Sequence, residues 1–177
     1  MKWIWIATEF ARKVRFQMRY GELSRAPLKL LRLELREDYA ECEWLARPSD
    51  PWDQDLSEQI REQNKTSQAL QDALTVREFL FSSIPQIRLA NLKVYRTTAW
   101  HSPQLIITGS VNREDVPPPR IASLVMRAKL YGLHFELVDG ALWSPGPESE
   151  RRRIHDRTKL SWKNAGSRKH INKGEHA

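Results

Sequence analysis

The segment from Leu56 to Ile84 is the sequence feature that most constrains the fold. Apolar side chains recur in it at spacings of three, four and seven residues, at Leu70, Ala73, Leu74, Phe81 and Ile84. This spacing places them on one face of an α-helix. Asp55 and Glu58 have the spacing of a capping box at its start. Pro85 ends it, because the residue before a proline is pushed out of the α region. The sequence therefore predicts a long helix with one face in the core.

Two segments before this helix alternate apolar and polar residues with the period of a β-strand. The apolar side chains are Leu31, Leu33 and Leu35 in residues 28–36, and Ala40, Cys42 and Trp44 in residues 39–46. Such alternation indicates strands with one buried and one solvated face. Residues 37–38 are short enough for a turn. We therefore predict an antiparallel hairpin, with arginine and glutamate side chains paired across its solvated face.

Three further strands and a second helix are predicted after Pro85. Apolar patterns indicate strands at residues 89–97, 105–111 and 133–138, while Ile121, Leu124, Val125, Ala128 and Tyr131 have helical spacing. Gly132 is suited to end that second helix. Gly109, inside a strand, indicates a bulge or the close approach of another backbone. Asp139 and Gly140 are typical of a two-residue hairpin turn. We expect Trp44, and also Trp143 on the strand that follows this turn, to lie in the core.

The order of these elements predicts an α+β domain over residues 27–143. Its antiparallel-rich sheet of about five strands carries two helices on one face, in the order β-β-α-β-β-α-β. From residue 39 to residue 138 this order resembles the ferredoxin-like split βαβ arrangement. In that arrangement, however, the first strand already has two neighbours, so the hairpin with residues 28–36 would displace one of them. A rearranged sheet is therefore the alternative, and neither arrangement identifies a function.

The net charge of +7 is concentrated at the two ends of the chain. Residues 1–26 carry a net charge of +4, residues 27–143 one of −2, and residues 144–177 one of +5. Residues 1–20 have the pattern of a basic amphipathic helix, so residues 1–26 are predicted to form a basic N-terminal arm. This helix either packs on its own domain or docks on an anionic membrane or a partner's groove. A third alternative is that translation begins at Met18.

Several chemistries are excluded by the residues that the chain lacks. The single cysteine, Cys42, excludes a disulfide framework and a cysteine-based zinc cluster, and its place on the inward face indicates a core residue. No glycine-rich phosphate loop or Gly-x-Ser-x-Gly elbow is present, and the histidines have no HxH or HxxxH spacing. Glu41 and Glu43 lie opposite arginines, which lowers a carboxyl pKa, the reverse of what a general acid needs. We therefore predict no catalytic residues, no metal site and no cofactor.

The chain also lacks a segment that would cross a membrane. No window approaches the roughly 18 apolar residues that a transmembrane helix needs. The apolar run at residues 3–7 is too short for the core of a signal peptide. Together with the single cysteine, these features predict a cytoplasmic protein without a transmembrane segment.

Residues 144–177 form the clearest functional feature of the sequence. Pro, Gly, Ser and charged residues replace any core pattern there, which predicts a disordered basic tail. A flexible positive segment that contains a tryptophan is suited to phosphate contacts and base stacking. The residues predicted to bind nucleic acid, a ribonucleoprotein or another polyanion are Arg151, Arg152, Arg153, Arg157, Lys159, Trp162, Lys163, Arg168 and Lys169. The alternative is a solubilising tail without a specific partner.

The first functional hypothesis is thus a non-enzymatic interaction protein. Its domain would form a homodimer or dock on a protein partner, while the tail engages nucleic acid. The second hypothesis is a small-ligand-binding protein, or an enzyme of unknown reaction, with a site near residues 95–101. A local mixture of aromatic and polar groups favours that place, namely Tyr95, Arg96, Trp100 and His101.

Overall fold

The computed structural model describes residues 2–19, 28–98, 102–116 and 120–143. In this part of the chain the helices are α1 (Lys2–Arg19), α2 (Glu58–Ser83) and α3 (Leu124–Leu130), with a short 3₁₀ helix, η1 (Pro51–Asp53). The strands are β1 (Lys29–Leu35), β2 (Tyr39–Leu45), β3 (Leu89–Thr97), β4 (Pro103–Asn112), β5 (Leu133–His134), β6 (Glu136–Val138) and β7 (Ala141–Trp143). The predicted tail, residues 144–177, lies outside the described residues.

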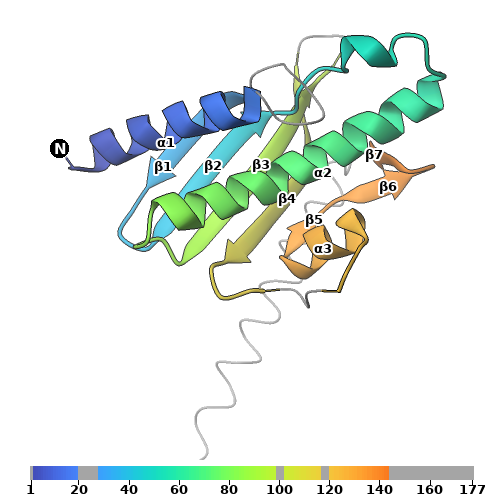
Figure 1. Cartoon of the computed structure of the whole chain (residues 1–177). Helices are drawn as coiled ribbons and strands as arrows, with labels where there is room; N and C mark the ends of the chain where they lie inside the picture. Colours follow the sequence, from blue (N-terminus) through green and yellow to red (C-terminus); the bar gives the residue numbers. More distant parts are fainter. Residues whose placement is uncertain (1, 20–27, 99–101, 117–119, 144–177) are drawn as a thin grey trace, which may run out of the picture. The chain divides into compact units, whose positions relative to one another are not determined.

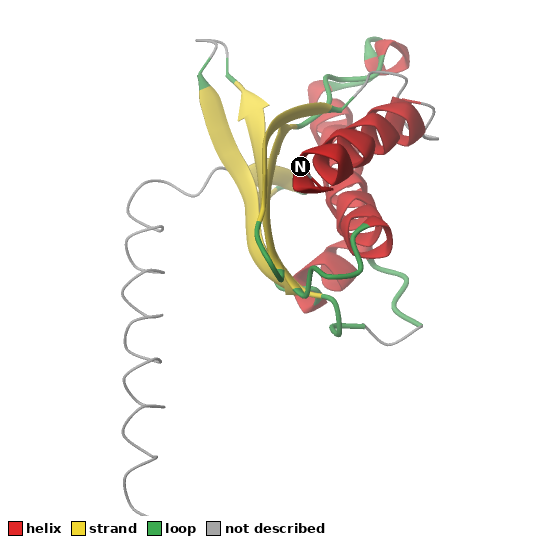
Figure 2. Ribbon diagram, turned by 90° about the vertical axis from the view of Figure 1, so that its left-hand side faces the viewer, coloured by secondary structure: helices red, strands yellow, loops and turns green. Residues whose placement is uncertain are grey.

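The described strands form a five-stranded sheet in the order β1-β2-β3-β4-β5 and a separate β6-β7 hairpin (Figure 1). Neighbouring strands of the sheet are antiparallel except β2 and β3, which are parallel and are joined through α2. The helices cover one face of the sheet, and its other face carries none of them (Figure 2). The predicted α+β class and antiparallel-rich five-stranded sheet are confirmed.

The ferredoxin-like arrangement is not what the structure shows. In a split βαβ unit another strand lies between the two parallel strands. Here β2 and β3 pair directly along the whole length of β2, from Tyr39 opposite Leu89 to Leu45 opposite Tyr95. The β1–β2 hairpin occupies the other edge of β2. A strand has only two edges, so with β1 on one edge of β2 the other edge is left for β3. The alternative prediction, a rearranged sheet, is therefore correct.

Helix α2 has the predicted apolar face but a different cap. Its buried apolar side chains are Ala69, Leu70, Ala73, Val76, Leu80 and Phe81. The N-cap is Ser57, whose hydroxyl accepts a hydrogen bond from the backbone N–H of Ile60 at 3.4 Å. The predicted capping box of Asp55 and Glu58 is therefore wrong. Since the helix begins at Glu58, that glutamate is its first residue and is too early to reach back to a cap.

Two apolar residues that were predicted to be buried are exposed. The pairing of β1 with β2 is irregular between Leu30 and Arg32, and Leu31 is 45% exposed. This β-bulge interrupts the alternation, so Leu30 takes the place of Leu31 against the core. Trp143 is 56% exposed, whereas Trp44 is fully buried as predicted. Trp143 lies on β7, which pairs with β6 in the two-stranded hairpin, so neighbouring strands cover less of its side chain.

The second half of the domain follows the predicted order with shorter elements. Helix α3 begins only at Leu124, where Ser123 caps it, so Ile121 precedes the helix. Gly132 ends it with a φ of +84°. The strand predicted over residues 133–138 is divided between β5, which pairs with β4, and β6, which pairs with β7. Asp139 and Gly140 make the predicted turn with positive φ at both residues.

Helix α1 packs on its own domain rather than standing free. It contacts α2 and β1, and Phe10 is only 1% exposed within the core. Ile4 and Trp5 remain exposed on its outer side. None of the helices in the described ranges is both long and apolar enough to cross a bilayer.

Gly109 marks a close approach between two backbones, which is one of its two predicted roles. A Cβ atom at this position would lie 2.4 Å from the carbonyl oxygen of Gly132 and 2.9 Å from the Cα of Leu133. Both atoms belong to the backbone where α3 ends and β5 begins, so they have no rotamer to change. The absence of a side chain at Gly109 is what allows β5 to pair with β4.

Replacement of this glycine should therefore destabilise the domain. We expect Gly109→Ala to lower the free energy of unfolding by about 3 kcal/mol, the upper end for overpacked sites. Urea denaturation followed by circular dichroism measures this change. Thr108→Ala, one residue earlier on β4, is the control and should cost less than about 1 kcal/mol. Equal stability of Gly109→Ala and the unaltered chain would contradict the close approach.

Candidate ligand pocket

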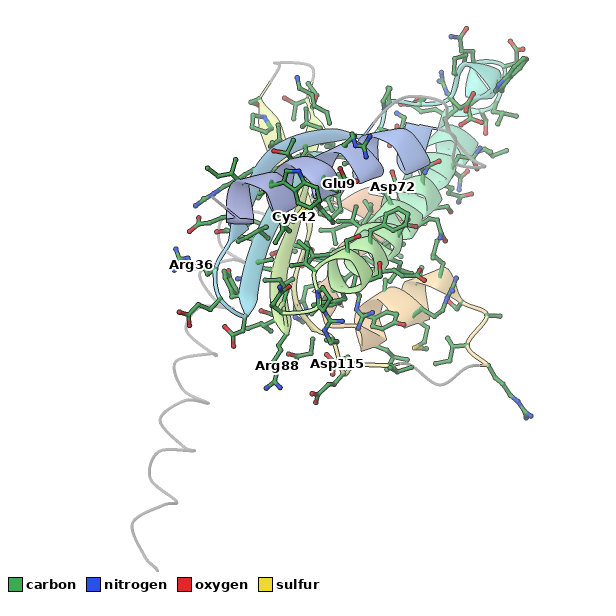
Figure 3. The ribbon with its side chains drawn as sticks, turned by 60° about the vertical axis from the view of Figure 1, so that its left-hand side comes forward. Glu9, Arg36, Cys42, Asp72, Arg88 and Asp115 are labelled. Carbon is green, nitrogen blue, oxygen red and sulfur yellow. The ribbon has the colours of Figure 1, made fainter. Side chains whose placement is uncertain are left out.

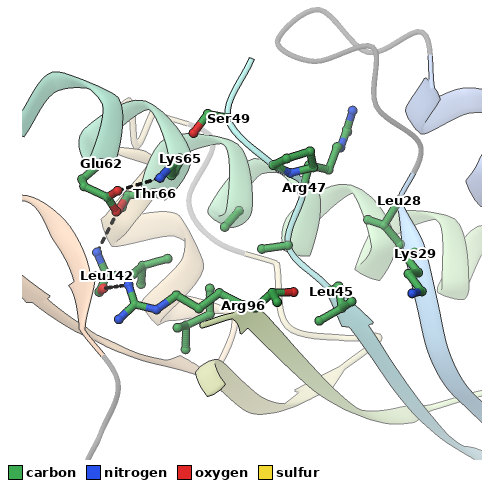
Figure 4. Close-up of a pocket in the computed structure, with 15 residues that line it drawn as sticks. Leu28, Lys29, Leu45, Arg47, Ser49, Glu62, Lys65, Thr66, Arg96 and Leu142 are labelled. Carbon is green, nitrogen blue, oxygen red and sulfur yellow. Dashed lines mark hydrogen bonds and ion pairs between the residues drawn. The ribbon is translucent and has the colours of Figure 1, made fainter. Parts of the chain in front are cut away.

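A pocket of about 960 Å³ opens where the carboxyl ends of β2 and β3 meet the first half of α2 (Figure 4). Its described lining residues are Leu28, Lys29, Leu45, Ala46, Arg47, Pro48, Ser49, Glu62, Lys65, Thr66, Ala69, Arg96, Thr97, Ile106 and Leu142. Seven of these are apolar, and the volume lies within the range of small-molecule sites. The pocket is therefore the candidate functional site of the described domain.

The parallel pairing of β2 and β3 explains why the pocket forms at this place. Two parallel strands cannot be joined by a tight turn, so the chain must leave the end of β2 and return to the start of β3. It does so through Pro48, η1 and α2. The first half of α2 therefore lies beside the carboxyl ends of both strands. In open sheets with parallel strands, ligands bind outside these ends.

A buried ion pair holds the wall of the pocket. The Arg47 guanidinium donates from Nε to Asp72 Oδ2 at 2.8 Å and from Nη2 to Asp72 Oδ1 at 2.5 Å. Gln68 Nε2 donates to Asp72 Oδ1 at 2.8 Å. The two charged side chains are only 3% and 2% exposed. Burial raises the pKa of the Asp72 carboxyl, while the hydrogen bonds from Arg47 and Gln68 act in the opposite direction. This pair ties the connection after β2 to the middle of α2.

Side chains of α2 and β3 attach the β6–β7 hairpin to one side of the pocket. Leu142 pairs with Leu137 across the hairpin. Its backbone N–H donates to Thr66 Oγ1 on α2 at 2.9 Å, and its carbonyl accepts from Arg96 Nη1 on β3 at 3.2 Å (Figure 4). Both backbone groups of Leu142 are thereby satisfied without a further strand. Thr66 and Arg96 thus fix the position of Leu142 in the wall.

Arg96 is half-buried, and its hydrogen-bond partners are neutral. Besides the carbonyl of Leu142, it donates from Nε to Gln104 Oε1 at 2.7 Å. No carboxylate of a described residue forms an ion pair with it. The neighbouring cation Lys65 differs, because its Nζ lies 2.6 Å from Glu62 Oε1. Arg47 is likewise matched by Asp72. Among the described lining residues, only Arg96 and the exposed Lys29 are cations without a carboxylate partner.

Two of the four residues of the predicted ligand site are described. Arg96 lines the pocket, whereas Tyr95 is half-buried and does not line it. Trp100 and His101 lie outside the described residues, as do all nine predicted nucleic-acid-binding residues. None of the other described lining residues was predicted as part of a site, including Lys65, Thr66 and Leu142 from distant parts of the chain. Only the polar composition of the first half of α2 signalled that this surface is not ordinary core.

The open face of the sheet carries paired charges rather than a second candidate site. Lys93 Nζ lies 2.7 Å from Glu41 Oε1 and 3.0 Å from Glu43 Oε1, with Arg32 nearby. The hydrogen bond from Lys93 and the neighbouring positive charges lower the pKa of Glu41, in the predicted direction, and the two glutamates raise the pKa of Lys93. Glu41 and Lys93 are thus held ionised and are unsuited to proton transfer near neutral pH.

Cys42 and the acidic groups of the described chain do not form a reactive centre. Cys42 is fully buried between the sheet and the helices, and this burial raises the pKa of its thiol to about 12 (Figure 3). A thiol that is protonated and inaccessible is not a nucleophile. Among the described residues, no group of three His, Cys, Asp or Glu side chains is placed to hold a metal ion.

The buried ion pair predicts a large difference between two similar substitutions on α2. Asp72→Asn leaves the Arg47 charge buried without its counterion, so it should lower the free energy of unfolding by about 3–5 kcal/mol. Glu62→Gln removes the carboxylate from the partly exposed Lys65 pair, which should cost less than about 1 kcal/mol. Urea denaturation of both variants measures the difference. Similar losses in the two variants would contradict the structural role of Asp72.

Comparisons with models of protein families, with curated proteins and with solved structures each found no match to this chain. Function must therefore be inferred from the pocket and its chemistry.

Proposed function

We propose that this chain is a non-enzymatic binding protein whose folded domain holds a small molecule in the pocket at the ends of β2 and β3. The observation that carries the proposal is the pocket itself, about 960 Å³ in volume and lined, among described residues, by seven apolar residues and eight polar or charged ones. Small-molecule sites combine apolar groups, which supply affinity, with polar groups, which fix orientation. The proposal favours the second of the hypotheses derived from the sequence, a small-ligand-binding protein. It keeps Arg96 from the predicted site at residues 95–101 and adds the other residues that line the pocket.

Binding is proposed rather than catalysis because of the polar groups that line the pocket. The hydroxyl groups of Ser49, Thr66 and Thr97 have no histidine or cysteine beside them among the described lining residues. Thr66 already accepts a hydrogen bond from Leu142. A nucleophile needs an adjacent base to become reactive, and no such pair is formed here by described residues.

Filling the pocket should abolish ligand binding without unfolding the domain. Thr97 lines the pocket near the exposed end of β3, so Thr97→Trp adds an indole there at small cost in stability. We expect ligand-observed NMR with a panel of small apolar and amphipathic compounds to find binders of the unaltered chain. Their binding should weaken at least tenfold in Thr97→Trp. Each binder should also raise the melting temperature, because it stabilises the folded state alone.

The matched control is Gln86→Trp, which adds the same indole at an exposed turn that does not line the pocket. It should bind every compound as the unaltered chain does. Loss of binding in both variants would indicate a general effect of the indole. A panel without binders, or binding that survives Thr97→Trp, would contradict the proposed function.

The second candidate function is binding of nucleic acid or another polyanion through residues 151–169, with partners such as a ribonucleoprotein. The observation that favours it is the net charge of +5 on residues 144–177, beside a nearly neutral central domain. Each phosphate contact releases condensed counterions, so affinity for DNA falls with salt at a slope near −0.9 for every phosphate that is neutralised. In this candidate function the domain also forms a homodimer or binds a protein partner.

A salt series on oligonucleotide binding tests this candidate. The full chain should bind a labelled single-stranded oligonucleotide with a steep salt dependence. Replacement of Arg151, Arg152 and Arg153 by glutamine should make the slope shallower by about two, because each phosphate neutralised on a single strand adds roughly −0.7 to it. Fluorescence anisotropy measures this slope between about 50 and 200 mM salt, because such binding weakens strongly over that range. An unchanged slope and affinity in the triple variant would contradict the role of these residues.

A further inference from the structure

We infer that the ligand of the pocket is an amphipathic carboxylate, whose carboxylate group binds Arg96 while its apolar body lies along the lining of the pocket. This inference rests on the proposed function and names its ligand class. It is carried by the position of Arg96, a half-buried cation without a carboxylate partner among the described residues, in a wall that also contains seven apolar residues.

The charge of Arg96 lies in the wall of the pocket without an opposite charge beside it. A charge removed from water is costly unless an opposite charge or several hydrogen bonds compensate it. Arg96 has two neutral acceptors, Gln104 Oε1 and the carbonyl of Leu142. Arg47 and Lys65 in the same wall each have a carboxylate within 2.6 Å. Arg96 is thus the half-buried cation of the described lining that has no carboxylate partner.

The guanidinium of Arg96 is held in place and keeps one nitrogen for a ligand. The hydrogen bonds to Gln104 and Leu142 use Nε and one hydrogen of Nη1. The Nη2 group donates to no described residue, and an anion is its natural partner. These bonds also fix the guanidinium plane, which lowers the entropic cost of binding a planar carboxylate. Thr66, which positions the other backbone group of Leu142, supports the same arrangement from α2.

The apolar residues of the lining favour a ligand with a hydrocarbon body beside its charged group. Leu28, Leu45, Ala69, Ile106 and Leu142 line the pocket from five different elements or their ends. Phosphate sites are built differently, from glycine-rich loops with converging backbone N–H groups or from several free cations. Here Arg96 is the half-buried cation of the described lining without a carboxylate partner, since Lys29, which also has none, is exposed. A single carboxylate balances the charge of Arg96, and the apolar side chains then cover a hydrocarbon body.

The experiment compares three probes with the same hydrocarbon chain on the full-length protein: octanoate, 1-octanol and octylammonium. Titrations followed by NMR, with the side-chain Nε–H signal of Arg96 as one reporter, give the three dissociation constants. We expect octanoate to bind at least tenfold more tightly than 1-octanol and to shift the Arg96 signal. Octylammonium should bind more weakly than 1-octanol.

Arg96→Gln removes the charge and leaves a shorter, neutral side chain that still donates hydrogen bonds. It should reduce the affinity for octanoate to that for 1-octanol, with 1-octanol binding retained. The control Arg88→Gln removes the same charge just before β3, at the opposite end of that strand from Arg96 (Figure 3), and should leave all three affinities unchanged. If Arg96→Gln does not fold, the probe comparison and the Arg96 signal of the unaltered chain decide.

The outcomes separate this inference from the proposed function. Equal affinity for octanoate and 1-octanol, or an octanoate preference that persists in Arg96→Gln, overturns the carboxylate assignment and leaves the pocket as a binding site for small molecules. Absence of binding by all three probes, together with no binder in the wider panel, overturns both. A preference for octanoate that depends on Arg96 and not on Arg88 supports the inference.

Discussion

The buried pair of Arg47 and Asp72 is the interaction on which the rest of the structure depends. It joins the chain just after β2 to the middle of α2, through side chains that are almost fully buried. The connection between two parallel strands is long, and this pair fixes where it turns. The first half of α2 is thereby held beside the carboxyl ends of β2 and β3. The pocket, the attachment of the β6–β7 hairpin and the position of Arg96 all follow from that placement.

The elements themselves were predictable from local pattern. The alternation around Ala40, Cys42 and Trp44 identified β2 and its inward face, because a strand with one buried side repeats every two residues. The helical spacing after Leu70 identified the buried half of α2 for the same kind of reason. Asp139 and Gly140 identified their turn, because few residues accept positive φ. In each case the signal lies within a few residues of the chain.

What depends on distant residues was not predictable. The bulge that exposes Leu31 arises from the pairing of β1 with β2, and the strand order arises from competition for the edges of β2. Likewise, Arg96 was proposed beside Tyr95, Trp100 and His101, whereas its described neighbours in the pocket include Thr66 and Leu142. These residues meet only because α2 and the hairpin fold back over β3. A single sequence records the residue types but not this meeting.

The central claim is that the pocket beside Arg96 is a binding site for an amphipathic carboxylate. The most direct measurement is a crystal structure of the full chain with octanoate bound. We predict a carboxylate oxygen about 2.7–2.9 Å from Arg96 Nη2, the length of a charge-assisted hydrogen bond, with the hydrocarbon chain against Ile106 and Leu142. A pocket filled by its own side chains, or octanoate bound elsewhere with its carboxylate away from Arg96, would contradict this claim.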